Sequence, residues 1–178
     1  HPFNLTPSAL YAIDQFAIRG GGVLAFLDTI AEHDARSATT PTNPQNADST
    51  LGPLMAAWGL KMDSKRVAGD ITMAIKIRGR AGSQVVVADY PPWMIVDRDN
   101  LNPDDVVTGQ LTLMRVATSA AIEHIDSSLT VMTPLIQTTA SSMLFDQAAV
   151  LRRDDPTQLT AAYAPSGAQL VLAARVTG

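Results

Sequence analysis

The stretch LYAIDQFAIRGGGVLAFLD, residues 10–28, decides the fold that the sequence predicts. Thr6 is a suitable N-cap for a helix across its first half, and Gly20 supplies the left-handed residue that ends such a helix. The run at 23–27 is almost wholly apolar and is closed by Asp28, which is typical of a strand buried on both faces of a sheet. Helix, tight glycine turn and buried strand together form half of a βαβ unit.

The rest of the chain alternates predicted strands with short helices. Two apolar runs at 71–77 and 84–89 flank a loop at 78–83 and predict an antiparallel hairpin, which we expect as a side excursion. Further strands are predicted at 93–96, 111–117, 129–133, 143–145 and 169–176, and further helices at 51–58, 102–109 and 155–162. We therefore expect an α/β fold with a mixed, largely parallel sheet flanked by helices, in a single domain.

Composition excludes several classes of partner and chemistry. The net charge is −4 and no run of Lys and Arg exceeds two adjacent residues, which argues against nucleic acid and against an anionic membrane surface. The chain has no cysteine, so disulfides, thiolate metal sites and cysteine nucleophiles are excluded. No apolar run approaches the roughly 20 residues of a membrane span. The abrupt start at His1 leads us to expect a piece of a longer protein.

The glycines at 20–22 suggest a phosphate-binding loop, but their order in the chain does not fit one. Phosphate loops run from a strand through glycines into a helix, so that the helix N–H groups face the anion. Here the glycines follow the predicted helix and precede the predicted strand. We therefore interpret them as a helix cap.

Acidic and amide side chains supply the first candidate ligand-binding residues. Asp28 would end a buried strand, and ligands of open α/β sheets bind beyond the carboxyl ends of strands. The alternative is that it is a turn-forming aspartate. Asp97 and Asn100 lie in the run DRDNLN at 97–102, which resembles a calcium loop in outline but lacks the glycine and the bidentate glutamate of that template. We interpret this run as a loop that ends in an N-cap, and we predict no metal site.

Aromatic side chains supply the remaining candidates. Tyr90 and Trp93 flank Pro91 and Pro92, so the four residues form a stiff corner. Together with Trp58, this corner could act as a binding platform. The alternative is that both tryptophans are core or interface anchors, which is the usual role of a large aromatic side chain.

The sequence contains no recognisable catalytic constellation. His33 and His124 lie far apart, no HExxH pair occurs, and no serine lies in a G-x-S-x-G motif. The acids are 15 Asp and 2 Glu, and their scattered positions single out no acid/base pair. We therefore predict neither a cofactor nor an enzymatic activity.

Five segments follow one another in the order seen in a known family. They are LYAIDQFAIRGGGVLAFLD (10–28), LGPLMAAWGLKMDSKRVAGD (51–70), DRDNLNPDDVVTGQL (97–111), MTPLIQT (132–138) and YAPSGAQLVLAARVTG (163–178). In them the chain resembles the auxiliary component of gliding-motility-type ABC transporters. The resemblance implies a membrane-anchored protein whose soluble region lies outside the cytoplasmic membrane and accompanies a permease and an ATPase.

The resemblance also implies a fold and a mode of action. The soluble region of such proteins is similar to flavodoxin-like or class I amidotransferase-like domains. Since this chain has no cysteine, it cannot carry the amidotransferase nucleophile, and the resemblance implies binding in place of acyl transfer.

Three hypotheses for the function follow. The first is a non-catalytic extracytoplasmic component that binds a solute, a glycan or partner subunits for an ABC transporter. The second is a carbohydrate- or peptidoglycan-binding module, built on the aromatic corner at 90–93 and a polar loop at 29–48. The third is an unrecognised hydrolase that uses Asp28 together with the run at 97–102.

Overall fold

The computed structural model describes residues 5–32, 51–152 and 155–178. Strands make up 38% of it and helices 20%. Every strand pair in these described ranges is antiparallel. The expected α/β fold with a largely parallel, flavodoxin-like sheet is therefore wrong. Residues 33–48 of the polar loop predicted at 29–48 lie outside the described residues.

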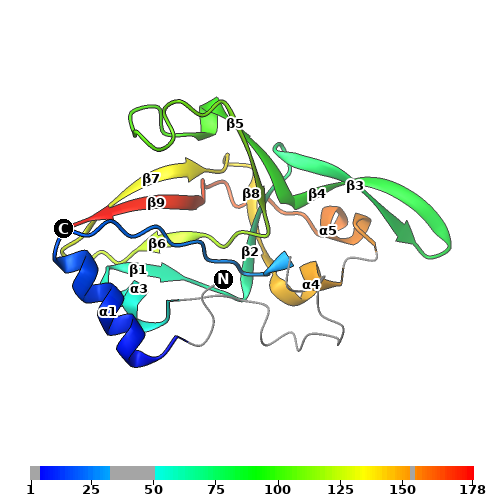
Figure 1. Ribbon diagram of the computed structural model, residues 1–178. Helices are drawn as coiled ribbons and strands as arrows, with labels where there is room; N and C mark the ends of the chain where they lie inside the picture. The colour runs from blue at the N-terminus through cyan, green and yellow to red at the C-terminus, as the bar shows by residue number, and fades with distance from the viewer. Residues whose placement is uncertain (1–4, 33–50, 153–154) are drawn as a thin grey trace.

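The strands form four small sheets (Figure 1). In chain order they are β1 (Leu60–Met62), β2 (Arg66–Asp70), β3 (Ala74–Ala81), β4 (Gln84–Asp97), β5 (Leu113–Ala117), β6 (Ile122–His124), β7 (Val131–Gln137), β8 (Ser142–Asp146) and β9 (Val171–Thr177). The sheet orders are β1-β6, β2-β8, β3-β4-β5 and β7-β9. Most partners come from distant parts of the chain, so no local turn or crossover helix marks their pairing in the sequence.

Short helices complete the described elements. They are α1 (Pro7–Ile18), α3 (Pro53–Ala57), the 3-10 helix η2 (Arg98–Asn100), α4 (Gln147–Leu151) and α5 (Thr157–Ala161). The helices predicted at 51–58 and 155–162 are confirmed as α3 and α5. The α4 helix was not predicted.

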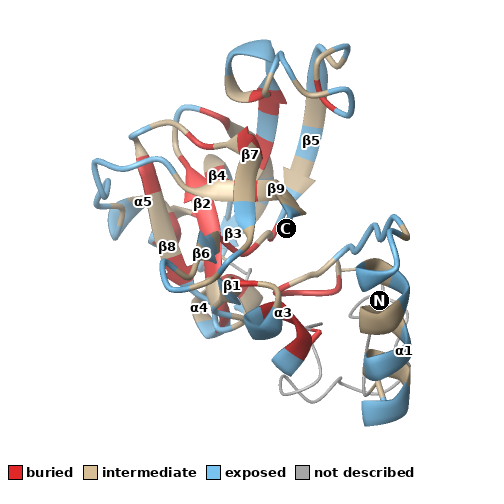
Figure 2. Cartoon of the chain, turned by 90° about the vertical axis from the view of Figure 1, so that its left-hand side faces the viewer, coloured by how far each residue is buried: buried red, intermediate tan, exposed pale blue. Residues whose placement is uncertain are grey.

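The predicted N-terminal helix is confirmed as α1. The Thr6 hydroxyl oxygen accepts a hydrogen bond from the backbone N–H of Ala9 at 3.2 Å, and Gly20 follows the helix with a φ of 89°. No residue of α1 is fully buried. The indole N–H of Trp58 donates to the Asp14 carboxylate at 3.0 Å and helps to hold the helix, which stands apart from the sheets in Figure 2.

The buried strand predicted at 23–27 is wrong. Residues 21–28 have no regular secondary structure, and the side chains of Leu24 and Phe26 are 80% and 74% exposed. A strand buried on both faces needs a neighbour on each side, and the small antiparallel sheets do not supply one. The segment instead runs past β6 toward α4 as an extended trace, drawn blue in Figure 1.

The predicted hairpin is confirmed and is longer than expected. Ala81 pairs with Gln84, so the turn consists of residues 82–83 in place of the predicted loop at 78–83. The second strand continues through the proline corner as far as Asp97. It therefore includes the separate strand predicted at 93–96.

The remaining predicted strands are present, but three further strands in the described ranges were not predicted. The strands predicted at 111–117, 129–133, 143–145 and 169–176 are confirmed as β5, β7, β8 and β9. The sequence analysis missed β1 and β6, which are too short to show an alternating pattern, and β2. In β2, Gly69 and Asp70 both disfavour a strand prediction.

The helix predicted at 102–109 is wrong, and the segment forms a series of turns. The Asn102 side-chain oxygen accepts the N–H of Asp104 at 3.0 Å, and the Asp105 carboxylate accepts the N–H of Val107 at 2.9 Å. Such local side-chain acceptors compete with the helical hydrogen-bond ladder. Arg175 from β9 also binds the Asp105 carboxylate with two nitrogens, at 2.7 and 2.8 Å, and holds the turns in place.

Buried side chains gather in three clusters. The first joins the sheet β3-β4-β5 to β7-β9 and includes Met94, Val96, Leu135, Ile136 and Leu172. The second joins β2, β4 and β8 to α4 and α5 and includes Val67, Tyr90, Phe145, Val150 and Leu159. The third is small: Leu51, Leu54 and Met55, against which Leu10 and Ile13 of α1 pack. The N-terminal helix is thus attached through the smallest of the three clusters.

Candidate functional site

The aromatic corner predicted as a binding platform lies against the core. Tyr90 is completely buried, and its hydroxyl donates to the carbonyl oxygen of Val150 at 3.4 Å. The ring of Trp93 packs edge-on against Tyr90, with the ring centroids 5.5 Å apart. The Trp93 indole N–H donates to the Glu32 carboxylate at 3.1 Å. The indole therefore ties residue 32 to β4.

The acidic and amide candidates are not gathered into one site. Trp93 pairs with Ala117 and Asp97 pairs with Leu113, so these two candidates lie at opposite ends of β5. The exposed Asp97 caps η2 by accepting the N–H of Asp99 at 3.1 Å, and Asn100 ends the same helix. Asp28 ends the extended segment and leads into residues 29–31, which lie at the Trp93 end of β5.

Residues 29–31 are buried, and two of their carbonyl oxygens accept hydrogen bonds from distant side chains. Thr29 and Ile30 are 0% and 1% exposed. The side-chain amide of Gln147 donates to the carbonyl oxygen of Thr29 at 2.6 Å. The Thr118 hydroxyl donates to the carbonyl oxygen of Ile30 at 3.2 Å. Thr118 has a φ of 50°, which is rare for a β-branched residue, so the backbone after β5 is shaped to make this contact.

A histidine and a serine lie close together beside β6, but they do not form a nucleophile–base pair. The Nε2 atom of His124 lies 3.0 Å from the Ser128 hydroxyl and 2.9 Å from the carbonyl oxygen of Thr130. In the tautomer that carries its hydrogen on Nε2, this nitrogen donates to the carbonyl oxygen of Thr130 and does not accept the serine proton. Thr130 also donates from its hydroxyl to the carbonyl oxygen of Trp58 at 2.9 Å. The group closes the turn before β7.

The fully buried carboxylate of Asp70 is saturated with hydrogen bonds. One oxygen accepts the N–H and hydroxyl of Thr72, at 2.9 and 2.6 Å, and the other accepts the N–H and hydroxyl of Thr139, at 2.8 and 2.6 Å. Burial opposes ionisation, but the bonds from Thr139 and Thr72 together lower the pKa of Asp70 below its ordinary value. This carboxylate joins the end of β2 to the loop before β8.

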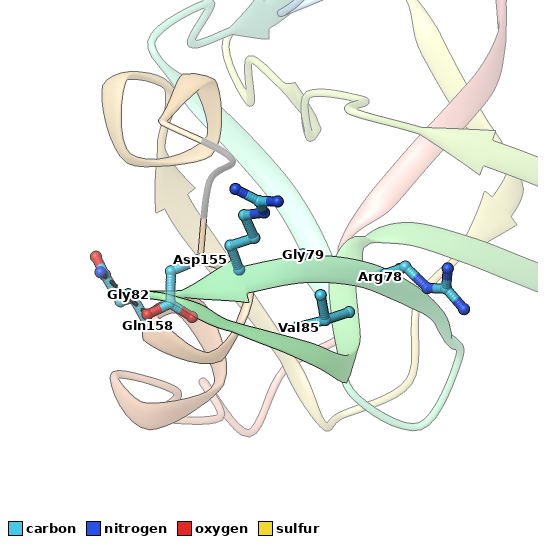
Figure 3. A pocket seen from close by; sticks show the side chains of 7 residues that line it. Arg78, Gly79, Gly82, Val85, Asp155 and Gln158 are labelled. Carbon is cyan, nitrogen blue, oxygen red and sulfur yellow. Dashed lines mark hydrogen bonds between the residues drawn. The ribbon is translucent and has the colours of Figure 1, made fainter.

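A shallow hollow of about 740 Å³ lies between the tip of the β3–β4 hairpin and the start of α5 (Figure 3). Its lining residues are Arg78, Gly79, Arg80, Gly82, Val85, Asp155 and Gln158. The Asp155 carboxylate accepts the hydroxyl and the N–H of Thr157, at 2.5 and 3.0 Å. The Thr157 hydroxyl bond is the main reason that the pKa of Asp155 lies below its usual range. The hollow therefore has guanidinium groups along the hairpin and a carboxylate at the helix start.

An exposed apolar surface covers the end of α1 and the segment after it. Its members, called here the N-terminal apolar surface, are Tyr11, Phe16, Ile18, Val23, Leu24 and Phe26, each at least 41% exposed. A Cβ atom on Gly21 would lie 2.4 Å from the ring of Phe16, so this ring covers the glycine backbone and joins the helix end to the segment. Exposed apolar side chains of this kind are available for contact with a partner.

Neither the N-terminal apolar surface nor the hollow beside the β3–β4 hairpin was predicted, although the sequence contains a signal for each. The apolar run at 23–27 favoured a buried strand, although an exposed apolar segment has the same composition. The cations of the hairpin recur at every second position, in Lys76, Arg78 and Arg80, which places them on one face of a strand. A search for adjacent basic residues does not detect such a pattern.

The family model described as ABC-type uncharacterized transport system matches residues 1–178. The chain belongs to this family. Its members are auxiliary components of ABC-type transport systems, and membership implies a membrane permease and an ATPase as partners in general. No curated protein and no solved structure matches the chain.

Two further findings concern the auxiliary component's described residues. None of its described helices is long and apolar enough to cross a bilayer. No group of three or more His, Asp or Glu residues in the described ranges is placed to hold a metal ion.

Proposed function

We propose that this auxiliary component lies outside the cytoplasmic membrane and acts by binding, without catalysis. In this proposal it docks on a membrane subunit of its transport system through the N-terminal apolar surface. The observation that carries the proposal is the exposure of this surface, in which Leu24 and Phe26 are the most exposed side chains. Family membership supplies the class of partner.

The apolar side chains offer a large free energy of association. Burying one Leu or Phe side chain completely is worth about 1.5–3 kcal/mol, and both Leu24 and Phe26 are mostly exposed. Interfaces gain most of their affinity from a few such anchors at their centre. Leu24 and Phe26 are large and exposed enough to supply such anchors.

The backbone of the same segment is also available. Residues 22–27 make no backbone hydrogen bond to another part of the described chain. An extended segment with free N–H and C=O groups can pair with a strand of a partner. Side-chain burial and backbone pairing would then act together at one contact.

The hydrogen-bonded polar clusters support a binding role. Asp70 uses both carboxylate oxygens in bonds to Thr72 and Thr139. His124 uses Nε2 as a donor within the turn that it closes. In both cases the group that could transfer a proton is already committed to holding the fold.

Introduced cysteines test the docking contact cleanly, because the chain has none of its own. Leu24→Cys or Phe26→Cys, placed in the whole protein and co-expressed with its permease and ATPase, should cross-link to the permease through a lysine- and thiol-reactive reagent. The matched control is Leu129→Cys, since Leu129 is 99% exposed and lies outside the N-terminal apolar surface. Equal cross-linking from all three positions, or from the control alone, would rule out docking through this surface.

The same control variant tests the location. A membrane-impermeant maleimide should label Leu129→Cys in intact cells, after removal of any outer membrane barrier, as fast as it labels the purified protein. Labelling that requires rupture of the cytoplasmic membrane would place this region in the cytoplasm and would refute an extracytoplasmic role.

A further inference from the structure

The β3 strand is an edge strand whose outer side is open. The sheet order is β3-β4-β5, so β3 has one neighbour. The backbone of residues 75–81 makes hydrogen bonds to β4 and to no other described segment. In Figure 1 the hairpin formed by β3 and β4 reaches away from the other sheets. The outer N–H and C=O groups of β3 can therefore accept another strand.

One face of this edge strand carries three cations. Lys76, Arg78 and Arg80 alternate along β3 and are all exposed, so they share a face; they are called here the cationic face. Lys76 is paired with Asp89 across the ladder at 2.8 Å. Arg78 and Arg80 lie opposite Val87 and Val85, and neither has an ion pair among the described residues.

The surroundings of the two arginines are apolar and concave. Val85 and Val87 are 61% and 64% exposed, so their methyl groups lie in solvent beside the guanidinium groups. Arg78, Arg80 and Val85 also line the hollow described above, which Figure 3 shows from close by. The hollow is open and shallow, so it offers a surface for contact and not an enclosed pocket.

The charges of the cationic face restrict which strand can pair with β3. Cations on an edge strand repel a second copy of the same strand, which is one way in which proteins prevent aggregation. They attract a strand with carboxylates at alternate positions, because opposite charges on facing strands stabilise a sheet. In a chain of net charge −4 this face is a local positive region, and guanidinium groups bind carboxylates with two parallel hydrogen bonds.

We propose that the β3 edge binds an extended acidic segment of a partner protein by strand addition. Carboxylates at alternate positions of that segment bind Arg78 and Arg80, and its backbone extends the sheet at β3. The intervening apolar side chains of the segment point to the opposite face of the sheet, on the same side as Ile75 and Ile77 of β3. This site is separate from the N-terminal apolar surface and does not depend on the proposed docking there.

The test uses a defined probe, a fluorescein-labelled peptide with the sequence (Glu-Val)4, and measures binding to the full chain by fluorescence anisotropy. We expect binding that weakens as salt is raised. The double variant Arg78→Glu/Arg80→Glu should bind at least about tenfold more weakly. The matched control Arg98→Glu/Arg152→Glu changes the charge equally at two other exposed arginines and should bind like the original protein.

Three further measurements decide whether the contact is strand addition. Backbone N-methylation of the peptide should abolish binding, and a (Lys-Val)4 peptide should not bind. Bound (Glu-Val)4 should slow amide hydrogen exchange within residues 75–81 of the unmutated chain, a readout that needs no variant to fold. Equal binding of the N-methylated peptide, or unchanged affinity of Arg78→Glu/Arg80→Glu, would overturn the proposal. So would binding of phosphatidylglycerol vesicles through these arginines without binding of the peptide.

Discussion

Residues 23–26 and residues 29–31 are separated by two positions and lie in opposite environments. The first segment contains Leu24 and Phe26, which are mostly exposed, whereas Thr29 and Ile30 of the second are fully buried. The first makes no backbone hydrogen bond to another part of the described chain. The second is clamped through carbonyl oxygens by Gln147 and Thr118.

The difference shows that hydrophobicity alone does not decide which segment enters the core. The exposed segment is the more apolar of the two, yet the buried one is where distant polar groups arrive to satisfy the backbone. A buried backbone group without a partner is unfavourable. Burial therefore follows the availability of hydrogen-bond partners as well as apolar side chains.

The largest expected effect comes from truncating the buried side of this comparison. Ile30→Ala removes a side chain packed in the cluster of Val67, Tyr90 and Val150 and should lower the free energy of unfolding by about 3 kcal/mol. Urea unfolding monitored by tryptophan fluorescence measures the change. The control Leu24→Ala alters the exposed segment, and a loss as large as that of Ile30→Ala would contradict the comparison.

Removing one clamp should have a smaller effect. Gln147→Ala leaves the carbonyl oxygen of Thr29 without its 2.6 Å donor in a buried site, which should cost about 2 kcal/mol of stability. Thermal unfolding measures the effect, with Gln158→Ala at an exposed position as the control. If the two variants had the same melting temperature, the clamp would not be what holds residues 29–31.

Loosening α1 should have a local effect. Asp14→Ala removes the acceptor of the Trp58 indole N–H, a contact worth about 1 kcal/mol. Amide hydrogens of α1 should then exchange about fivefold faster, while those of β2 and β8 keep their rates. Hydrogen-exchange mass spectrometry separates the two regions, and Asp126→Ala serves as the exposed control. Equal acceleration throughout the chain would show that α1 is an integral part of the core.

The smallest effect is expected on the exposed side. The double variant Leu24→Ser/Phe26→Ser should change the free energy of unfolding by less than about 0.5 kcal/mol, as is usual for surface substitutions. Its urea midpoint is compared with that of the unmutated chain. A loss of more than about 1.5 kcal/mol in the free energy of unfolding would mean that these side chains stabilise the fold. They would then not be free to bind a partner.

The sequence predicted the elements whose signals are local. Thr6 and Gly20 bound α1 through a cap and a left-handed residue, and the two apolar runs at 71–77 and 84–89 identified the hairpin. The helix predicted at 102–109 was wrong. Asp and Asn side chains accept hydrogen bonds at the start of a helix, but they stabilise isolated turns in the same way. For the candidate site, the pattern placed Trp93 in a strand and Asp97 in the loop after it, without revealing that the two residues pair with opposite ends of β5.

What the sequence determined by itself is the set of pieces: α1 with its caps, the β3–β4 hairpin, the lack of thiol chemistry, and the ordered segments that mark the family. Tertiary structure alone decided that β2 pairs with β8, that the run at 23–27 stays exposed, and that Arg78 and Arg80 border a hollow with Asp155. The physical reason is the separation along the chain of the residues that interact. Caps and turns act across a few residues, whereas burial and pairing depend on which distant segments meet, and small antiparallel sheets leave little local trace of that choice.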